Sequence, residues 1–471
     1  MNTAIVWFRR DLRLEDNPAL AAALRQQAAI VAVYIHAPDE EAPWQPGAAS
    51  CWWLHHSLQA LRLALRERGV ELQLRCGDSA EQLAALVRQC GADAVYFNRL
   101  YEPAIAARDR RVARELKALG CALHGFNASL FADPWEVETG QGTPYRVFTP
   151  YWRNLRARLK PRPGSAAPRR IAAVALDGNA ALDDLKLLPA IRWDTGLHEA
   201  WLPGEAGAHE ALADFCDAAV RDYAAKRDYP AQAATSRLSP YLHFGEISPQ
   251  QIFWRLEELA QQRGQAFREM AEPFVRELGW REFSHHLMHH FPQTPKKNLN
   301  PQFDKFPWRD TDRAQLQAWQ QGRSGIPIVD AGMRELWHTG WMHNRVRMVV
   351  ASFLCKNLRQ HWRHGARWFW DTLVDADLAN NTQGWQWTAG TGADAAPYFR
   401  IFNPVSQGER FDADGSYVRR WVPELARQPF KSIHAPWKQP ALLSQSGYPA
   451  PLVDLAESRE AALAAYQQMK A

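Results

Sequence analysis

Three residues in the segment FVRELGWREF combine an acid, a large aromatic ring and a cation. Glu277, Trp280 and Arg281 stand at positions i, i+3 and i+4, a spacing that places all three on one face of a helix. A carboxylate can hydrogen-bond the polar edge of a ligand, and an indole can stack on its flat face. Taken alone, the pattern is explained better by a surface ion pair beside a core tryptophan.

The densest run of polar residues lies between Asp375 and Trp387, in DADLANNTQGWQW. Two acids, two amides and two tryptophans so close together are difficult to place in an apolar core, because a buried acid needs a partner. A nearby arginine would supply that partner for Asp375. The segment is therefore a candidate binding site.

Two further segments carry groups that suit a bound ligand. In TSRLS (235–239), three hydroxyls, an arginine and backbone N–H groups form a possible diphosphate cradle, although an ordinary helix cap explains them as well. In GWMHNRVRMVV, Asn344 and Met348 share a helix face, so that an amide and a polarizable thioether can both touch a planar ligand. A core methionine explains the second pattern equally well.

The charge, tryptophan and cysteine content of the chain limits the classes of protein to which it can belong. The net charge is +5, and residues 1–150 contribute 16 basic and 17 acidic residues, so the basic excess lies in the remainder. That excess permits a polyanionic partner. Sixteen of the 21 tryptophans also follow residue 150. The six cysteines form no C-x-x-C pair, and no long apolar run or secretory signal is present, so we expect a protein of the bacterial cytosol or nucleoid.

The first part of the chain alternates short apolar runs with amphipathic helices. The runs at 3–8, 30–36, 70–76, 92–97 and 121–126 are predicted to be buried strands. Strand and helix in alternation predict a doubly wound parallel sheet, an α/β domain over residues 1–130. No G-x-G-x-x-G or Walker motif follows a strand, which argues against a dinucleotide at the first turn of this sheet.

The remainder is predicted to be a linker followed by a larger all-α domain. Residues 131–205 lose the periodicity and contain the Pro/Arg-rich stretch 160–170, so we expect a surface linker there. Residues 206–471 are helical in pattern. Ser248 opens one helix with a capping box that has proline at N1. Others are expected at 266–290, 312–321, 328–338, 342–361, 366–373 and 456–469.

These segments together resemble the photolyase/cryptochrome family, nearly from end to end. The motifs that carry the resemblance occur in the family's order: VWFRRDLRLEDNPAL, TSRLSPYL, ELGWREF, GIPIVDAGMRELWHTGWMHNRVRM, DADLANNTQGWQW and DAAPYFRIFNPVSQGERFD. Within the family, the sequence is most like a bacterial DNA photolyase for cyclobutane pyrimidine dimers. A set of six ordered motifs is far more specific than any one of them.

The resemblance implies that the helical domain binds FAD non-covalently. The Thr235–Ser239 loop would hold the diphosphate, Arg347 would balance Asp375, and Asn381 would face flavin N5. A neutral amide suits N5, because a carboxylate there would repel an anionic reduced flavin. The residues implied to bind the cofactor are Tyr223, Thr235, Ser236, Arg237, Leu238, Ser239, Phe274, Arg281, Arg347, Asp375, Ala376, Asp377 and Asn381.

The resemblance further implies that a pyrimidine dimer is flipped out of DNA and held by the protein. Glu277 would hydrogen-bond the dimer, and Trp280 and Trp387 would stack on it. Extrusion costs a few kcal/mol, and two stacking contacts of roughly 1–3 kcal/mol each can offset that cost. The residues implied to contact DNA or the dimer are Arg227, Glu277, Trp280, Asn344, Arg345, Met348, Trp387, Gln407 and Arg410.

The implied mechanism is light-driven electron transfer without net redox change. Excited reduced FAD (FADH⁻) would donate an electron to the dimer, which opens and returns it. Trp385, Trp362 and Trp308 match the family's tryptophan chain from flavin to surface, and with Glu277 and Asn381 they complete the expected catalytic set. Repair enzymes for (6-4) photoproducts place two histidines where this chain has Asn344 and Met348, so cyclobutane dimers are the better substrate.

Three questions stay open from the sequence. The folate-binding Asn-Glu pair of bacterial relatives is replaced by Ala104 and Ile105, so an antenna chromophore (folate, deazaflavin or none) has no assigned residues. A photosensory cryptochrome would share the fold, but it would usually carry a long C-terminal extension, and a DASH-like enzyme would act on single strands. A flavin-independent nucleic-acid-binding protein is the alternative from another class. We expect a monomer with no metal site.

Overall fold

The computed structural model describes residues 2–395 and 399–470. The chain forms two compact units, each assembled from three segments. The first contains Met1–Asp194, Trp201–Arg221 and Ser236–Pro292, and the second contains Thr195–Ala200, Asp222–Thr235 and Gln293–Ala471. The sequence-predicted boundaries at 130 and 205 therefore do not coincide with the boundaries of these units.

A five-stranded parallel sheet organises the N-terminal part of the first unit, with strand order β3-β2-β1-β4-β5. Every predicted strand is present, and the strands are β1 (Thr3–Phe8), β2 (Ala29–His36), β3 (Leu72–Cys76), β4 (Ala94–Asn98) and β5 (Ala122–Phe126). Central strand β1 pairs on both sides, so that Val6 faces Ala32 of β2 and Tyr96 of β4. The predicted doubly wound α/β fold is confirmed.

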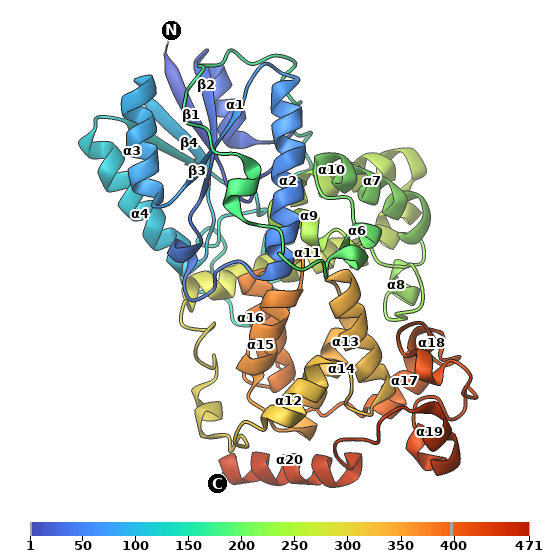
Figure 1. The fold of residues 1–471 in the computed structure, drawn as a ribbon. Helices are drawn as coiled ribbons and strands as arrows, with labels where there is room; N and C mark the ends of the chain where they lie inside the picture. The colour runs from blue at the N-terminus through green and yellow to red at the C-terminus, as the bar shows by residue number, and fades with distance from the viewer. Residues whose placement is uncertain (1, 396–398, 471) are drawn as a thin grey trace. The chain divides into compact units, whose positions relative to one another are not determined.

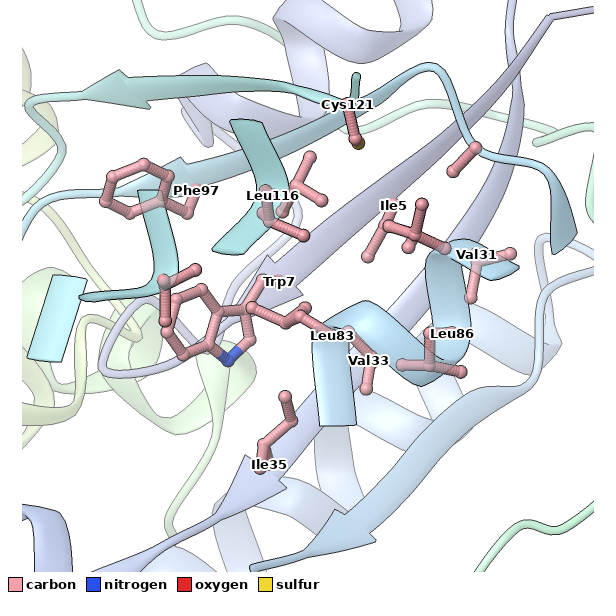
Figure 2. Close-up of a cluster of buried hydrophobic side chains, with 14 of the residues drawn as sticks. Ile5, Trp7, Val31, Val33, Ile35, Leu83, Leu86, Phe97, Leu116 and Cys121 are labelled. Atoms are coloured by element: carbon pink, nitrogen blue, oxygen red, sulfur yellow. The ribbon is translucent and has the colours of Figure 1, made fainter. Parts of the chain in front are cut away.

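Helices cover both faces of the sheet. Leu83 of α3 and Leu116 of α4 pack against Trp7 and Val33 in a buried apolar cluster on one face (Figure 2). Helix α1 packs on β1, β4 and β5 from the other face (Figure 1). The helices of this part are α1 (Pro18–Arg25), α2 (Ala48–Arg66), α3 (Ser79–Cys90) and α4 (Pro103–Ala118).

The residues that follow β1, at the carboxyl end of the sheet, form a buried polar network. The guanidinium of Arg9 pairs with Asp109 at 2.8 Å, and the side-chain amide of Asn98 donates to Asp11 at 2.6 Å. Arg13 is fully buried and donates to the Gly245 and Ala128 carbonyls. Burial raises the pKa of Asp11. The first family-like motif therefore has a structural role, joining the sheet to later segments of the same unit.

The predicted linker contains a helix that the sequence analysis missed. Helix α5 (Phe148–Arg158) buries Phe148, Tyr151, Trp152 and Leu155, and it packs on α11. This apolar spacing is itself helical, and Pro150 lies in the first turn. A proline there costs little, because N–H groups of the first turn have no partner within the helix. The expectation of a purely surface linker over 131–205 is therefore wrong.

The first unit also contains α7 (Glu205–Asp214), α9 (Ser239–Phe244), α10 (Pro249–Arg263) and α11 (Gln265–His290). The capping box predicted at the start of α10 is present, because the side chains of Ser248 and Gln251 each accept from the other's backbone N–H. Buried Glu246 accepts hydrogen bonds from Trp53 Nε1 (3.0 Å) and Gly204 N (2.6 Å), and burial raises its pKa to about 8.

The second unit is helical. Its helices are α6 (Thr195–Ala200), α8 (Tyr223–Lys226), α12 (Arg313–Gln320), α13 (Pro327–Thr339), α14 (Asn344–Ser352), α15 (Trp362–Thr372), α16 (Leu378–Ala389), α17 (Pro404–Phe411), α18 (Ser416–Trp421), α19 (Pro440–Ser446) and α20 (Leu455–Lys470). A π-helical turn, Phe353–Asn357, follows α14. The predicted helix over 342–361 is thus broken into two pieces. The all-α class predicted for this region is confirmed.

A buried lysine lies beside an apolar cluster of Phe303, Phe306, Phe399, Ala462 and Ala465, the last two of which belong to α20. Lys356 Nζ donates to the Ala389 carbonyl at 2.6 Å and lies 3.2 Å from the ring centroid of Phe399. Burial lowers the pKa of this amine to about 7. The lysine thus ties the C-terminus of α16 to the segment that follows it.

Candidate functional site

Glu277 and Trp280 lie one turn apart on α11, and both are partly exposed. The indole of Trp280 stacks on Phe148 of α5, with the ring centroids 3.7 Å apart and the planes at 10°. Phe283 contacts the same indole in a T-shaped arrangement at 6.0 Å. Two neighbours therefore fix the orientation of Trp280, and one face of the ring is already covered by Phe148.

Two further residues of α11, Phe274 and Arg281, were predicted from the sequence to bind the cofactor, and both make contacts within the protein. Arg281 donates to the backbone carbonyls of Ser129 (2.6 Å) and Leu242 (3.4 Å). Phe274 is buried, and its ring centroid lies 4.4 Å from that of Phe215. Both residues hold elements of the first unit together, and their contact with a cofactor stays a prediction.

The loop predicted to cradle a diphosphate ends where α9 begins, at Ser239. Arg237 has a left-handed backbone with a φ of 51°, and its guanidinium carbon lies 4.0 Å above the Trp201 ring. The hydroxyl of Ser236 accepts from the backbone N–H of Leu238 at 3.3 Å. Thr235 and Ser236 are half-buried. The loop therefore presents hydroxyl and guanidinium groups from a fixed turn.

In the second unit, Tyr223 opens α8 and is buried beneath Arg227, whose guanidinium carbon lies 5.6 Å from the ring.

The predicted pairing of Asp375 with an arginine is present in the second unit. Arg347 Nη2 lies 2.9 Å and 3.1 Å from the two carboxylate oxygens of Asp375, and Arg347 Nε donates to the Met342 carbonyl at 2.7 Å. The Asp375 side chain is buried, whereas the Arg347 side chain is 24% exposed. A charged pair with one accessible side can contact a polar ligand without leaving a buried charge unpaired.

The segment after Asp375 begins α16 and positions Asn381. Ala376 is buried, and Asp377 caps the helix by accepting from Asn380 N at 2.8 Å. The side-chain nitrogen of Asn381 donates to the Ala366 carbonyl at 2.9 Å. Because the nitrogen is used in this way, the side-chain oxygen of Asn381 is the atom that can accept a hydrogen bond from a ligand.

The three tryptophans predicted to carry electrons lie in the interior of the second unit and towards its surface. Trp385 is buried with its ring 5.0 Å from Phe369, and Trp362 is buried with its Nε1 donating to Asn298 at 2.9 Å. His361 lies 5.6 Å from the Trp362 ring and 4.9 Å from the half-buried Trp308 ring. The sequence identified the three tryptophans but not His361 or Asn298.

Two arginines predicted to contact DNA meet at one ring. The guanidinium carbons of Arg345 and Arg410 lie 4.5 Å and 5.0 Å from the Phe411 centroid. Arg345 also pairs with Asp228 at 2.7 Å. Within the described part of the chain, the buried side-chain oxygen of Gln407 has no hydrogen-bond partner. The structure thus gathers Arg345, Arg410 and Phe411 into a cationic cluster, and the sequence analysis had missed Phe411.

The remaining predicted contacts are partly open to solvent. Asn344 is exposed at the start of α14, and Met348 is half-buried one turn later. Trp387 is half-buried, and its Nε1 donates to the Asp394 carbonyl at 3.2 Å. Residues 396–398, which belong to the last predicted motif, lie outside the described residues. The accessible side chains keep an amide, a thioether and an indole available to a ligand.

One group of possible metal ligands occurs among the described residues, formed by Glu15, Glu205 and His209. The Glu205 carboxylate already accepts from the backbone N–H groups of Leu14 and Glu15 at 2.9 and 2.8 Å. These hydrogen bonds give Glu205 a structural role that needs no metal ion.

The donor chemistry of each unit is compatible with FAD. Hydroxyls and the arginine of the loop at 235–239 suit a diphosphate. In the second unit, the Arg347–Asp375 pair and the Asn381 side-chain oxygen suit the polar edge of an isoalloxazine ring, which carries both donors and acceptors.

Comparison with known proteins identifies the family. The model of the FAD binding domain of DNA photolyase matches residues 274–468, and the DNA photolyase model matches residues 4–169. A deoxyribodipyrimidine photo-lyase of Agrobacterium fabrum is 46% identical over 99% of this chain and 98% of its own. Cryptochrome-1 of Arabidopsis thaliana is 40% identical over 99% of this chain and 70% of its own.

Solved structures agree with the sequence comparisons. A bacterial class III photolyase from Agrobacterium tumefaciens superimposes with a TM-score of 0.95 at 45% identity, covering 100% of this chain and 98% of the other. The chain therefore belongs to the photolyase/cryptochrome family. It is an enzyme of the photolyase class, with a DNA photolyase domain followed by an FAD-binding domain. Among the residues that the structure describes, no helix combines the length and apolar composition needed to cross a membrane.

Proposed function

We propose that this enzyme repairs cyclobutane pyrimidine dimers in DNA under blue light. The observation that carries the proposal is the arrangement on α11, where the carboxylate of Glu277 lies one turn from an indole that Phe148 holds rigidly at 3.7 Å. A fixed aromatic surface loses little entropy on stacking, and the neighbouring carboxylate can pair with the N–H edge of a flipped pyrimidine. Reduced FAD, when bound, supplies the electron that opens the cyclobutane ring on illumination.

The chain's own residues bind and orient the damaged bases. In the first unit, Glu277 accepts the hydrogen bond from the dimer, and Trp280 stacks along its apolar side. In the second unit, Asn344, Met348 and Trp387 supply neutral contacts. Because neither Asn344 nor Met348 can donate a proton as an acid at neutral pH, the cyclobutane dimer is the substrate favoured over the (6-4) photoproduct.

The cationic cluster of Arg345, Arg410 and Phe411 is proposed to hold DNA phosphates. Arg410 is exposed, and it forms no ion pair within the described part of the chain. The unpartnered oxygen of Gln407 lies on the same short helix, α17. We assign Arg227, half-buried over Tyr223, to the same task. Contacts of this kind set affinity for DNA of any sequence.

The aromatic side chains of the second unit are proposed to conduct electrons inward. The buried Trp385 and Trp362 and the half-buried Trp308 are the expected carriers, and His361 lies between the rings of Trp362 and Trp308. This path restores the reduced cofactor and is separate from the repair step.

The test compares two variants of α11 on a thymine-dimer oligonucleotide under blue light, with the repair quantum yield expressed per bound FAD. Glu277→Gln should lower the yield and the dimer affinity, because removing the carboxylate charge weakens a hydrogen bond worth roughly 1.5–3 kcal/mol. Glu269→Gln is the matched control, since Glu269 is exposed on the same helix, and it should repair normally. Equal yields for the two variants would contradict the assignment.

A photosensory function is the second candidate, supported by the 40% identity to a plant cryptochrome over 99% of the chain. The same assay distinguishes the two functions. A flavin-loaded, light-responsive protein that repairs neither duplex nor single-stranded dimers would be a receptor, whereas repair confined to single strands would indicate a DASH-like enzyme.

A further inference from the structure

A basic hollow lies on the first unit, where α5 packs on α11. None of the motifs named in the sequence analysis contains all of the residues that line it. Its volume is about 420 Å³. The side chains that line it come from both helices and are Thr149, Trp152, Arg153, Arg156, Ala157 and Arg276. The hollow is therefore lined by hydrogen-bond donors, namely three guanidinium groups and one hydroxyl. The indole of Trp152 forms its aromatic floor.

Among the described residues, one of the three arginines is neutralised by acids. Arg156 pairs with Glu272 at 3.1 Å and lies 3.9 Å from Glu257. Arg153 and Arg276 are exposed, and within the described residues neither forms an ion pair. The guanidinium carbon of Arg276 lies 5.3 Å from the centroid of the Phe148 ring, which also stacks on Trp280. This contact with Phe148 limits the motion of the Arg276 side chain. The hollow therefore presents two unpaired guanidinium groups at its rim.

The aromatic floor connects this hollow with Trp280. Trp152 is 9% exposed and packs against Gly279, where a Cβ would come within 2.4 Å of the indole. The Trp152 and Phe148 planes are nearly parallel at 7°, and the Phe148 and Trp280 planes at 10°. Three nearly parallel rings thus lead from the hollow to the residue proposed to stack on the dimer.

We propose that this hollow binds a backbone phosphate of the DNA strand that flanks the dimer. The inference rests on the proposed function and adds to it a second place where the strand is held. Arginine forks bind phosphate oxygens in a bidentate manner, and the Thr149 hydroxyl adds a donor of the right type. The continuous ring surface places the hollow a short distance along the strand from the base pair that is opened.

The test uses the flavin-loaded enzyme and the double variant Arg153→Ala/Arg276→Ala. Its matched control is Arg88→Ala/Arg114→Ala, which removes two exposed arginines from α3 and α4 of the same unit. Binding is measured by salt titration on a duplex containing one thymine dimer. The test variant should bind roughly tenfold more weakly, and its slope of log K against log salt should fall by about 0.9 for each phosphate that the protein no longer neutralises. The control should keep the wild-type slope.

Substrate length separates a failure of this site from a failure of the proposed function. Wild-type enzyme should bind a dimer strand more tightly when a short run of nucleotides is added on one particular side, and the test variant should lose that gain. Arg153→Lys/Arg276→Lys should retain most of it. Equal slopes for the test and control variants, or weaker binding already present on the isolated dinucleotide dimer, would overturn the phosphate site. Wild-type enzyme that repairs no dimer would instead overturn the proposed function.

Discussion

A glycine in the second unit controls where Trp385 can lie. Gly365 of α15 faces the edge of the Trp385 indole, and a Cβ at position 365 would lie 2.0 Å from Cη2, 2.4 Å from Cζ3 and 2.5 Å from Cζ2. The rings of Phe369 and Trp319 lie 5.0 Å and 6.2 Å from the same indole and limit its retreat. Gly365→Ala should therefore displace Trp385 or push α15 and α16 apart.

The size of this effect follows from the interatomic distances. To restore the optimal separation of about 3.5 Å between carbon atoms, the indole must move by roughly 1.5 Å. Overpacking of this kind costs about 1–3 kcal/mol, and the better helix propensity of alanine returns at most about 1 kcal/mol. We expect a net loss of stability and a slower reduction of the flavin by light, since Trp385 is the first carrier of the proposed path.

Gly384→Ala is the matched control on α16. Gly384 is exposed, and a Cβ there meets no atom within 4 Å, so alanine should stabilise the helix by up to ~1 kcal/mol. The measurements are the urea midpoint and the rate of photoreduction under a fixed external reductant. The reasoning is refuted if Gly365→Ala is as stable as Gly384→Ala, or if it loses stability while its photoreduction rate equals that of the wild type.

Three other expectations can be measured independently. Trp362→Phe should block photoreduction of oxidised flavin yet leave repair by dithionite-reduced enzyme near the wild-type rate, and poor repair by the reduced variant would show that Trp362 is structural. Arg345→Ala or Arg410→Ala should weaken damaged and undamaged duplexes alike and lower the salt slope by about 0.9 each, whereas Trp280→Ala should reduce lesion discrimination with little change in slope. Burial lowers the pKa of Lys356 from 10.5 to about 7, so between these values the unfolded chain binds more protons and stability should rise with pH by up to ~1.4 kcal/mol per pH unit. Lys356→Met should remove this slope in denaturation curves recorded across the interval.

The fold was largely predictable because each strand and most helices have clear local sequence patterns. All five strands were located within two residues of their observed limits, since buried parallel strands form continuous apolar runs. Helix α5 was missed although Phe148, Tyr151, Trp152 and Leu155 have helical spacing, because the long stretch 131–205 around it loses the periodicity as a whole. Pro150 lies in the first turn of this helix, where a proline removes no hydrogen bond within the helix.

The candidate site was predictable only where chemistry demands a partner. A buried acid needs a cation, and the expected pair of Asp375 with Arg347 is present. The stacking of Phe148 on Trp280 could not be predicted, because contacts between distant segments depend on how the helices pack. Likewise, Arg281 shares a helix face with Glu277 in the sequence, yet its guanidinium donates to the backbone carbonyls of Ser129 and Leu242.

The interleaving of the two units along the chain has a consequence for synthesis on the ribosome. Thr195–Ala200 and Asp222–Thr235 belong to the second unit, whose main segment starts only at Gln293. These two early segments emerge long before their partners exist, while the first unit is complete only once Pro292 has left the exit tunnel. A nascent chain halted at a point where Pro292 has just left the exit tunnel should thus hold a protease-resistant first unit with two cleavable loops, and the same loops should become resistant once the remainder is translated.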